Sequence, residues 1–220
     1  ALTINDNATA ASITTITADG YVAVSTIGGV NATTALTTLN LANAGAGVDM
    51  VVADTAATLA LSLDSMGAST DTDEAVVTLT AAPATLNITN TGASYVDLTA
   101  NATTALTVEG SSALNLSNST LTALETLTVS GAVGLTADVS ASASLTAVST
   151  VATTGDSTIT LNGQNATFTG GIGADDLTLS TTAPTETIDL GEGDDSITLA
   201  AGTTVLGTNG AISGGNGVDT

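Results

Sequence analysis

Short apolar pairs of the form U-x-U, in which U is apolar and x is polar, recur along residues 84–199. This alternation places both apolar side chains of a pair on one face of a short strand. Several alternate pairs are 20 or 21 residues apart, as the steps from Leu86 to Leu106 and from Leu106 to Leu127 show. The pairs are Leu86/Ile88, Val96/Leu98, Leu106/Val108, Leu114/Leu116, Leu127/Val129, Ile159/Leu161, Leu177/Leu179, Ile188/Leu190 and Ile197/Leu199. A period near 20 with two short strands per period predicts a solenoid.

The expected fold class is therefore all-β, a right-handed parallel β-helix or β-roll solenoid with about 20 residues per coil. The Leu-x-x-Leu-x-Leu phrases of the chain also suggest leucine-rich repeats, but the glycine-rich nonapeptides described below and the wealth of threonine favour a β-helix. We expect three segments. Residues 1–83 form a β-rich start of the solenoid, residues 84–169 form coils without metal motifs, and residues 170–220 form coils that carry them.

Residues 170–178 fit the nonapeptide Gly-Gly-x-Gly-x-Asp-x-U-x at every fixed position, which is a calcium-binding repeat of parallel β-helices. Copies follow at residues 190–198, with leucine in the first slot, and at residues 214–220, while a weaker copy lies at residues 44–52. Glycine lets the backbone turn through positive φ, and aspartate supplies the hard oxygen that calcium prefers. The candidate metal ligands are Gly171, Gly173, Asp175, Gly191, Gly193, Asp195, Gly215, Gly217, Asp219 and, upstream, Asp49.

The three C-terminal copies lie about one coil apart, 20 and then 24 residues, so their aspartates should stack as a ladder with coils about 4.8 Å apart. Neighbouring carboxylates at such distances repel by roughly 1–4 kcal/mol, and calcium between coils would reverse that sign. The plainer interpretation is a set of Gly-Asp turns without metal. The acidic run of Asp71, Asp73 and Glu74 is open to two interpretations as well, a solvated loop or a further calcium site.

The chain carries 21 acidic residues and no lysine, arginine or histidine, for a net charge of −21. It therefore lacks the basic residues that neutralise phosphates, which argues against nucleic-acid binding. Cysteine is absent, which removes disulfides and zinc–thiolate sites. No apolar run reaches the length of a transmembrane helix, and residues 1–3 do not start a signal peptide. Because the chain opens without methionine and stops inside a repeat, we expect it to be a segment of a longer protein.

The nonapeptides, the lysine-free acidic composition and the Ala/Thr/Ser-rich strands resemble the repeats-in-toxin (RTX) group of calcium-binding bacterial proteins, and within it the surface-layer proteins of Gram-negative bacteria. The resemblance implies type I secretion, calcium bound between coils by aspartates and turn carbonyls, and folding driven by extracellular calcium. It further implies self-assembly into a two-dimensional lattice on the cell surface. Lipopolysaccharide is an implied partner, through regions outside this chain.

The leading functional interpretation is a structural calcium-binding protein without enzymatic activity. An RTX adhesin stalk or another extracellular binding solenoid, such as an ice-binding one, is the first alternative. The second is a polysaccharide-degrading β-helix, because two carboxylates suffice for glycoside hydrolysis. Its candidate pairs would be Asp175/Asp176 and Asp194/Asp195.

Overall fold

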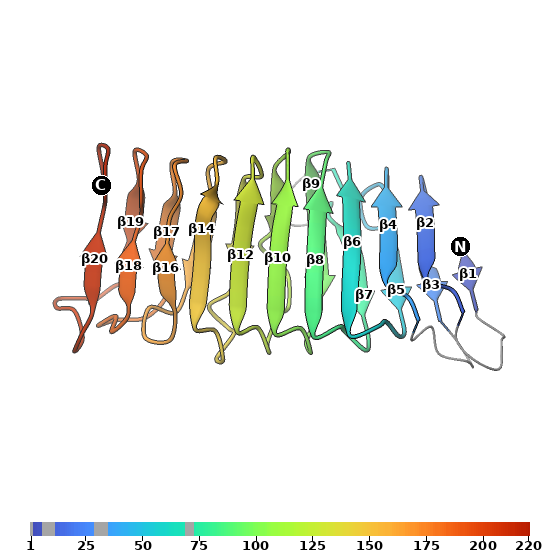
Figure 1. Ribbon diagram of the computed structural model, residues 1–220, viewed down its shortest axis with the longest axis horizontal. Coiled ribbons are helices and arrows are strands. Elements are labelled where there is room, and N and C mark those ends of the chain that lie inside the picture. The colour runs from blue at the N-terminus through green and yellow to red at the C-terminus, as the bar shows by residue number, and fades with distance from the viewer. Residues whose placement is uncertain (1, 6–11, 29–34, 69–72) are drawn as a thin grey trace.

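All regular structure in the computed structural model is β-strand, over the residues that it describes, 2–5, 12–28, 35–68 and 73–220. The strands alternate between two ten-stranded parallel sheets, with the odd-numbered strands in one and the even-numbered strands in the other (Figure 1). The chain thus forms a β-solenoid of about nine turns with about 21 residues per turn. The all-β solenoid expected from the sequence is confirmed.

The strands of the first sheet are β1 (Thr3–Ile4), β3 (Ser25–Ile27), β5 (Asp49–Val52), β7 (Ala75–Leu79), β9 (Ser94–Thr99), β11 (Leu114–Leu116), β13 (Leu135–Asp138), β15 (Thr158–Leu161), β17 (Asp176–Leu179) and β19 (Ser196–Thr198). Those of the second sheet are β2 (Thr15–Asp19), β4 (Thr38–Ala42), β6 (Thr58–Asp64), β8 (Thr85–Asn90), β10 (Ala105–Gly110), β12 (Thr126–Gly131), β14 (Ala147–Thr153), β16 (Thr167–Thr169), β18 (Thr187–Asp189) and β20 (Ala211–Ser213).

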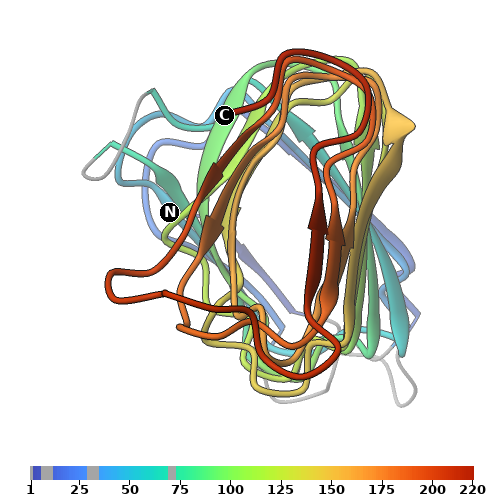
Figure 2. The ribbon, with the colours of Figure 1, turned by 90° about the vertical axis from the view of Figure 1, so that its left-hand side faces the viewer.

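The coil is right-handed and flattened. In Figure 1 the even-numbered strands run up the near face while the chain advances from right to left, and the odd-numbered strands return behind them. Seen along its axis, the solenoid has the two sheets facing each other, joined by turns at two edges (Figure 2). Right-handed crossovers are the rule for parallel strands, since the strand twist favours them.

Coil length varies along the chain. Leu86, Leu106 and Leu127 pair across β8, β10 and β12, which gives the 20- and 21-residue steps expected from the sequence. Towards the N-terminus the coils are longer, and Asp49 pairs with Val76, 27 residues later. The extra residues lie in the turns, which can lengthen without disturbing the paired strands.

The core fills the space between the sheets. Each strand buries alternate residues, because successive side chains point to opposite faces of a sheet. The inward positions of the second sheet stack in register from coil to coil, and Phe168, the sole phenylalanine of the chain, lies among them at 1% exposure. This column comprises Leu86, Leu106, Leu127, Val148, Phe168 and Ile188.

Only one residue of the expected apolar pair Ile197/Leu199 faces the core. Ile197 packs against the core, but Leu199 is 40% exposed because β19 ends at Thr198 and the chain turns away. Both sheets continue across the two boundaries expected from the sequence, at residues 83/84 and 169/170. The three expected segments therefore belong to one solenoid and differ only in their sequence motifs. Of the acidic run, Asp71 lies outside the described residues.

Candidate metal-binding edge

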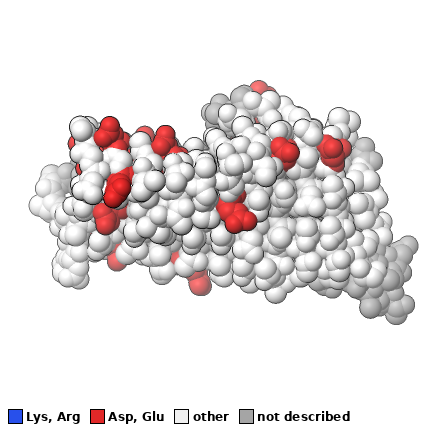
Figure 3. Space-filling model, turned by 45° about the horizontal axis from the view of Figure 1, so that its top comes forward, with Lys and Arg blue, Asp and Glu red and all other residues white. Residues whose placement is uncertain are grey.

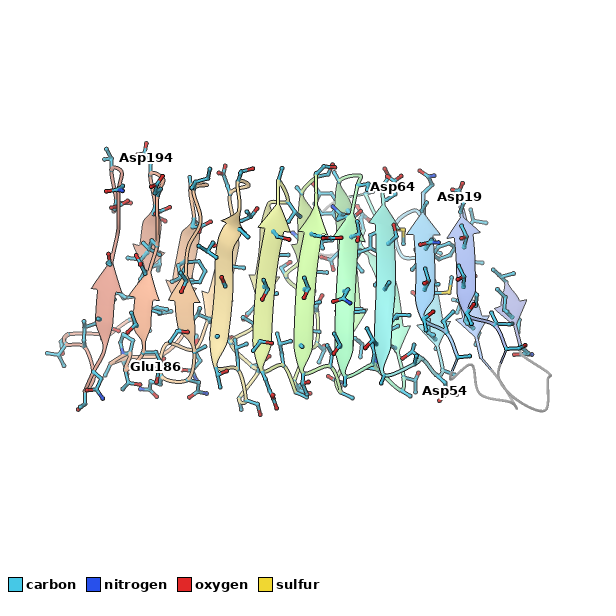
Figure 4. The ribbon with its side chains drawn as sticks, viewed as in Figure 1. Asp19, Asp54, Asp64, Glu186 and Asp194 are labelled. Atoms are coloured by element: carbon cyan, nitrogen blue, oxygen red, sulfur yellow. The ribbon has the colours of Figure 1, made fainter. Side chains whose placement is uncertain are left out.

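The three C-terminal nonapeptides lie on one edge of the solenoid. We define the upper edge as the set of turns that connect each even-numbered strand to the next odd-numbered strand, at the top of Figure 1. Asp19, Asp64 and Asp194 lie along this edge, whereas Asp54 and Glu186 lie along the opposite one (Figure 4). Acidic side chains gather on the upper edge over the C-terminal coils (Figure 3).

Within this edge, the motif aspartates form a hydrogen-bonded ladder, which we call the aspartate ladder. Each carboxylate accepts a backbone N–H from the coil before it. Ser157 N–H donates to Asp175 Oδ1 at 3.0 Å, and Asp175 N–H donates to Asp195 Oδ1 at 2.7 Å. Asp195 N–H then donates to Asp219 Oδ1 at 3.2 Å. The stack that the motif spacing predicts is therefore present.

Two rungs of the aspartate ladder are buried, since Asp175 is 2% exposed and Asp195 is 1% exposed, whereas Asp219 is exposed. Both oxygens of Asp175 have donors, the second being the Thr150 hydroxyl at 3.0 Å. Oδ2 of Asp195 is buried without any hydrogen-bond partner. A buried carboxylate oxygen without a donor is costly, and this chain has no cationic side chain to supply one.

Burial raises the pKa of Asp175, an effect that the Thr150 and Ser157 hydrogen bonds oppose and the Asp195 charge adds to. Burial also raises the pKa of Asp195, opposed by the Asp175 N–H and reinforced by the charges of Asp219 and Asp194. Desolvation of the charged form is therefore the leading cause at both rungs. Either a proton or a bound cation would relieve it.

The upper edge recruits residues that lie outside the nonapeptide motif. Thr150 takes the next inward position after Val148 on β14, ahead of the two consecutive exposed residues at which the register against β12 shifts, and its hydroxyl reaches Asp175. The turn one coil earlier supplies Ser157 to the aspartate ladder and Asp156 beside it, whose Oδ1 accepts the Ala174 N–H at 2.9 Å. This earlier turn could have been found in the sequence, because a Gly-Asp pair lies shortly before the Ile159/Leu161 pair.

Glycine is required where the motif turns stack. Gly191, Gly193, Gly215 and Gly217 have φ between +87° and +146°, which side-chain-bearing residues rarely adopt. A Cβ on Gly191 would also lie 2.5 Å from the Gly171 carbonyl oxygen, and one on Gly193 would meet the Gly173 carbonyl. The turns thus hold carbonyl oxygens and carboxylates in close layers.

The upstream copy of the motif is built differently. Asp49 opens β5, is only partly buried, and pairs with Val76 on the outward face of the first sheet. It is therefore one position out of phase with the inward-pointing Asp175. Burial, with the nearby Asp49 charge adding to it, raises the pKa of Tyr21. The structure does not place Asp49 in the aspartate ladder.

Adjacent carboxylates of the motif turns point apart. Asp175 is buried while Asp176 is exposed and accepts a hydrogen bond from the Ser196 hydroxyl at 2.7 Å. In the next coil Asp195 is buried while Asp194 is exposed and accepts the Val218 N–H at 2.9 Å. Neither pair converges on a common point.

The residues of the upper edge fit a hard cation. Carboxylates and backbone carbonyls are the oxygen ligands that calcium takes, with six to eight per ion. No group of three or more acidic side chains converges among the described residues. A calcium ion here would therefore combine the carboxylates of two neighbouring rungs, such as Asp175 and Asp195, with the turn carbonyls of Gly171, Gly173 or Gly191. The partnerless oxygen of Asp195 is the first donor available to it.

The raised pKa values predict an unusual pH dependence of the metal-free protein. The folded state holds the Asp175 and Asp195 protons more tightly than the unfolded chain, whose aspartate pKa is about 3.9. This contribution to the free energy of unfolding is greatest below that value and is lost as pH rises through the raised pKa values. We expect thermal unfolding in chelator to shift to lower temperature between pH 4 and pH 7. A double Asp175→Asn/Asp195→Asn variant should show a shallower dependence, and an unchanged slope would contradict the assignment.

The chain matches no protein-family model, no curated protein and no solved structure. The described residues contain no helix that is long and apolar enough to cross a membrane.

Proposed function

We propose that this chain is a calcium-stabilised structural solenoid of the bacterial cell surface, of the RTX surface-layer kind. Folding and self-assembly into a lattice would follow the binding of extracellular calcium. The β-solenoid fold is consistent with a structural repeat protein, in which each coil contacts only its neighbours.

The observation that carries the proposal is the buried aspartate ladder in a chain without cations. Asp175 and Asp195 are almost fully buried one coil apart, and Asp195 keeps one oxygen without a partner. A buried charge in a folded protein is paired or binds a metal. With no lysine, arginine or histidine available, a proton or an external cation must fill that role.

Calcium would act by linkage between binding and folding. An ion that binds only the folded state stabilises it by about 2.7 kcal/mol at a hundred-fold excess over Kd. Extracellular calcium modules have Kd near 10⁻⁴–10⁻³ M, so folding would stay off inside the cell and switch on outside. The net charge of −21 disfavours the compact state without the ion, and bound calcium would reduce that self-repulsion.

The substitution Asp195→Asn separates the two roles of this carboxylate. Asparagine keeps an oxygen to accept the Asp175 N–H and removes the buried charge. We expect the variant to be at least as stable as the parent in chelator, and to lose most of the stabilisation of about 2.7 kcal/mol that saturating calcium gives the parent. Far-UV circular dichroism of parent and variant in chelator and in saturating calcium, with thermal unfolding wherever a β signal is present, measures both effects.

Glu186→Gln is the matched control, because it removes the same charge from the opposite edge of the solenoid (Figure 4). It should keep the full response to calcium. An Asp195→Asn variant that responds to calcium as strongly as the parent would contradict the proposed site.

Other functions of an acidic solenoid make different predictions. Calcium-dependent sheets in electron microscopy would support a lattice protein, whereas single extended particles at saturating calcium would favour an adhesin stalk. A polysaccharide-degrading enzyme needs two carboxylates flanking one bond. The outward position of Asp176 and Asp194 beside buried partners supports the structural proposal over that one.

A further inference from the structure

A second buried carboxylate lies outside the nonapeptide turns. Glu74 directly precedes β7 and is 6% exposed. Its Oε2 accepts a hydrogen bond from Asn118 Nδ2 at 3.0 Å, and its Oε1 is buried without a partner. Asn118 follows β11, so the contact crosses the coil of β9 and joins two coils that do not pair directly.

This arrangement leaves a negative charge undercompensated. One amide donor serves the whole Glu74 carboxylate, and the chain holds no cationic side chain. Removing a hydrogen-bond partner from a buried polar atom costs the full desolvation penalty of that atom. The position therefore favours a cation from solution.

We propose that Glu74 and Asn118 form a calcium site that is separate from the aspartate ladder and ties three successive coils together. A glutamate can bind calcium through both oxygens, and an asparagine side-chain oxygen is a common further ligand. Turning the Asn118 amide by 180° exchanges its nitrogen for Oδ1, and this choice of orientation follows the groups that face it. In the metal-bound form, Glu74 and Asn118 would both present oxygen.

The surroundings of Glu74 add negative charge. Asp97 lies on the intervening strand β9 beside Val76, so it is a diagonal neighbour of Glu74 on the outward face of the first sheet. Burial raises the pKa of Asp97. Asp73 precedes Glu74 in the chain and is exposed. Calcium tolerates such irregular sets of oxygens, whereas magnesium demands a near-ideal octahedron.

The register of the first sheet supplies a reporter for this site. Ala75 pairs with Val96, so Glu74 and Tyr95 each directly precede a paired residue on neighbouring strands. The chain has two tyrosines and no tryptophan. Terbium, a luminescent substitute for calcium, emits on tyrosine excitation only when it is bound close to the ring. The ladder aspartate Asp175 lies four coils from Tyr95, roughly 19 Å at about 4.8 Å per coil, so terbium there would contribute little.

The test is a terbium titration of the 220-residue chain with tyrosine excitation. We expect sensitised emission that is lost in Glu74→Gln and in Tyr95→Phe, and retained in Tyr21→Phe and in Glu186→Gln. Calcium should displace the terbium at lower concentration than magnesium does. Circular dichroism of each variant shows whether it is folded.

A second variant keeps the test decisive if Glu74→Gln does not fold. Asn118→Asp adds a carboxylate oxygen and should bind terbium more tightly if a cation lies between the two side chains. Weaker binding by that variant, absence of emission from the folded parent, or emission that survives Glu74→Gln would each overturn the proposal. Emission that depends on Tyr21 would place the ion at Asp49 and overturn it as well. The aspartate ladder is tested by the calcium-dependent unfolding of Asp195→Asn, which is a different readout, so this inference and the proposed function can fail independently.

Discussion

Replacing Gly193 by alanine is expected to destabilise the C-terminal coils severely. Gly193 has φ +138°, a conformation that costs an L-residue about 1–3 kcal/mol. Its Cβ would in addition meet the Gly173 carbonyl of the coil before it, which belongs to backbone and cannot move aside freely. We therefore expect a loss above that range, measured by thermal or urea unfolding at fixed calcium concentration.

Two other glycines serve as controls for this substitution. Gly202 has φ +90°, and no atom lies within 4 Å of the position that its Cβ would take, so Gly202→Ala should show the backbone strain alone. Gly45 has neither a positive φ nor a close neighbour, and Gly45→Ala should be near neutral. Equal losses in Gly193→Ala and Gly202→Ala would show that close stacking of the turns contributes nothing.

Truncating Phe168 to alanine should cost about 3–5 kcal/mol, the range for a fully buried aromatic side chain. Phe168 lies between Val148 and Ile188 in the stacked column of the second sheet, so the cavity would adjoin both neighbouring coils. In a solenoid each coil depends on its neighbours, and the loss should appear first as early unfolding of the adjacent coils. Hydrogen exchange resolved along the chain would locate it.

Val151→Ala is the control for the core substitution, because Val151 lies on β14 near the same coil and is 60% exposed. Surface substitutions of this kind change stability by about 0.5 kcal/mol or less. A Phe168→Ala variant as stable as Val151→Ala would mean that the sheets are not packed around this column as described.

Much of the fold follows from local pattern. The U-x-U pairs fix which side chains face inward, and their spacing near 20 fixes how pairs such as Leu86 and Leu106 stack. These are short-range properties of the sequence, since alternation and coil length need no knowledge of distant contacts. The N-terminal coils are harder to place from sequence because their turns are longer, as the 27-residue step from Asp49 to Val76 shows.

The upper edge is predictable only in part. The motif spacing predicts the stacking of Asp175, Asp195 and Asp219, and their N–H bonds confirm it. The motif carries no information about Thr150, because that residue lies on β14, one coil before the motif turn that holds Asp175.

Glu74 and Asn118 are 44 residues apart and belong to no motif, so their contact depends on coil register and turn shape. Asp49, by contrast, belongs to a motif and still does not join the aspartate ladder. Its motif is nearly complete, yet its strand begins one residue out of phase, which places the carboxylate on the outward face.

We propose that calcium binding and folding of this solenoid are linked through the aspartate ladder. The most direct test is a calcium titration of the 220-residue chain from a chelated start at neutral pH, followed by far-UV circular dichroism, with magnesium in a parallel titration. We predict a transition from coil to β signal between sub-millimolar and millimolar calcium, absent with magnesium and weakened in Asp195→Asn. A full β signal in chelator that calcium does not stabilise further would contradict the account, and the Gly-Asp turns would then be turns alone.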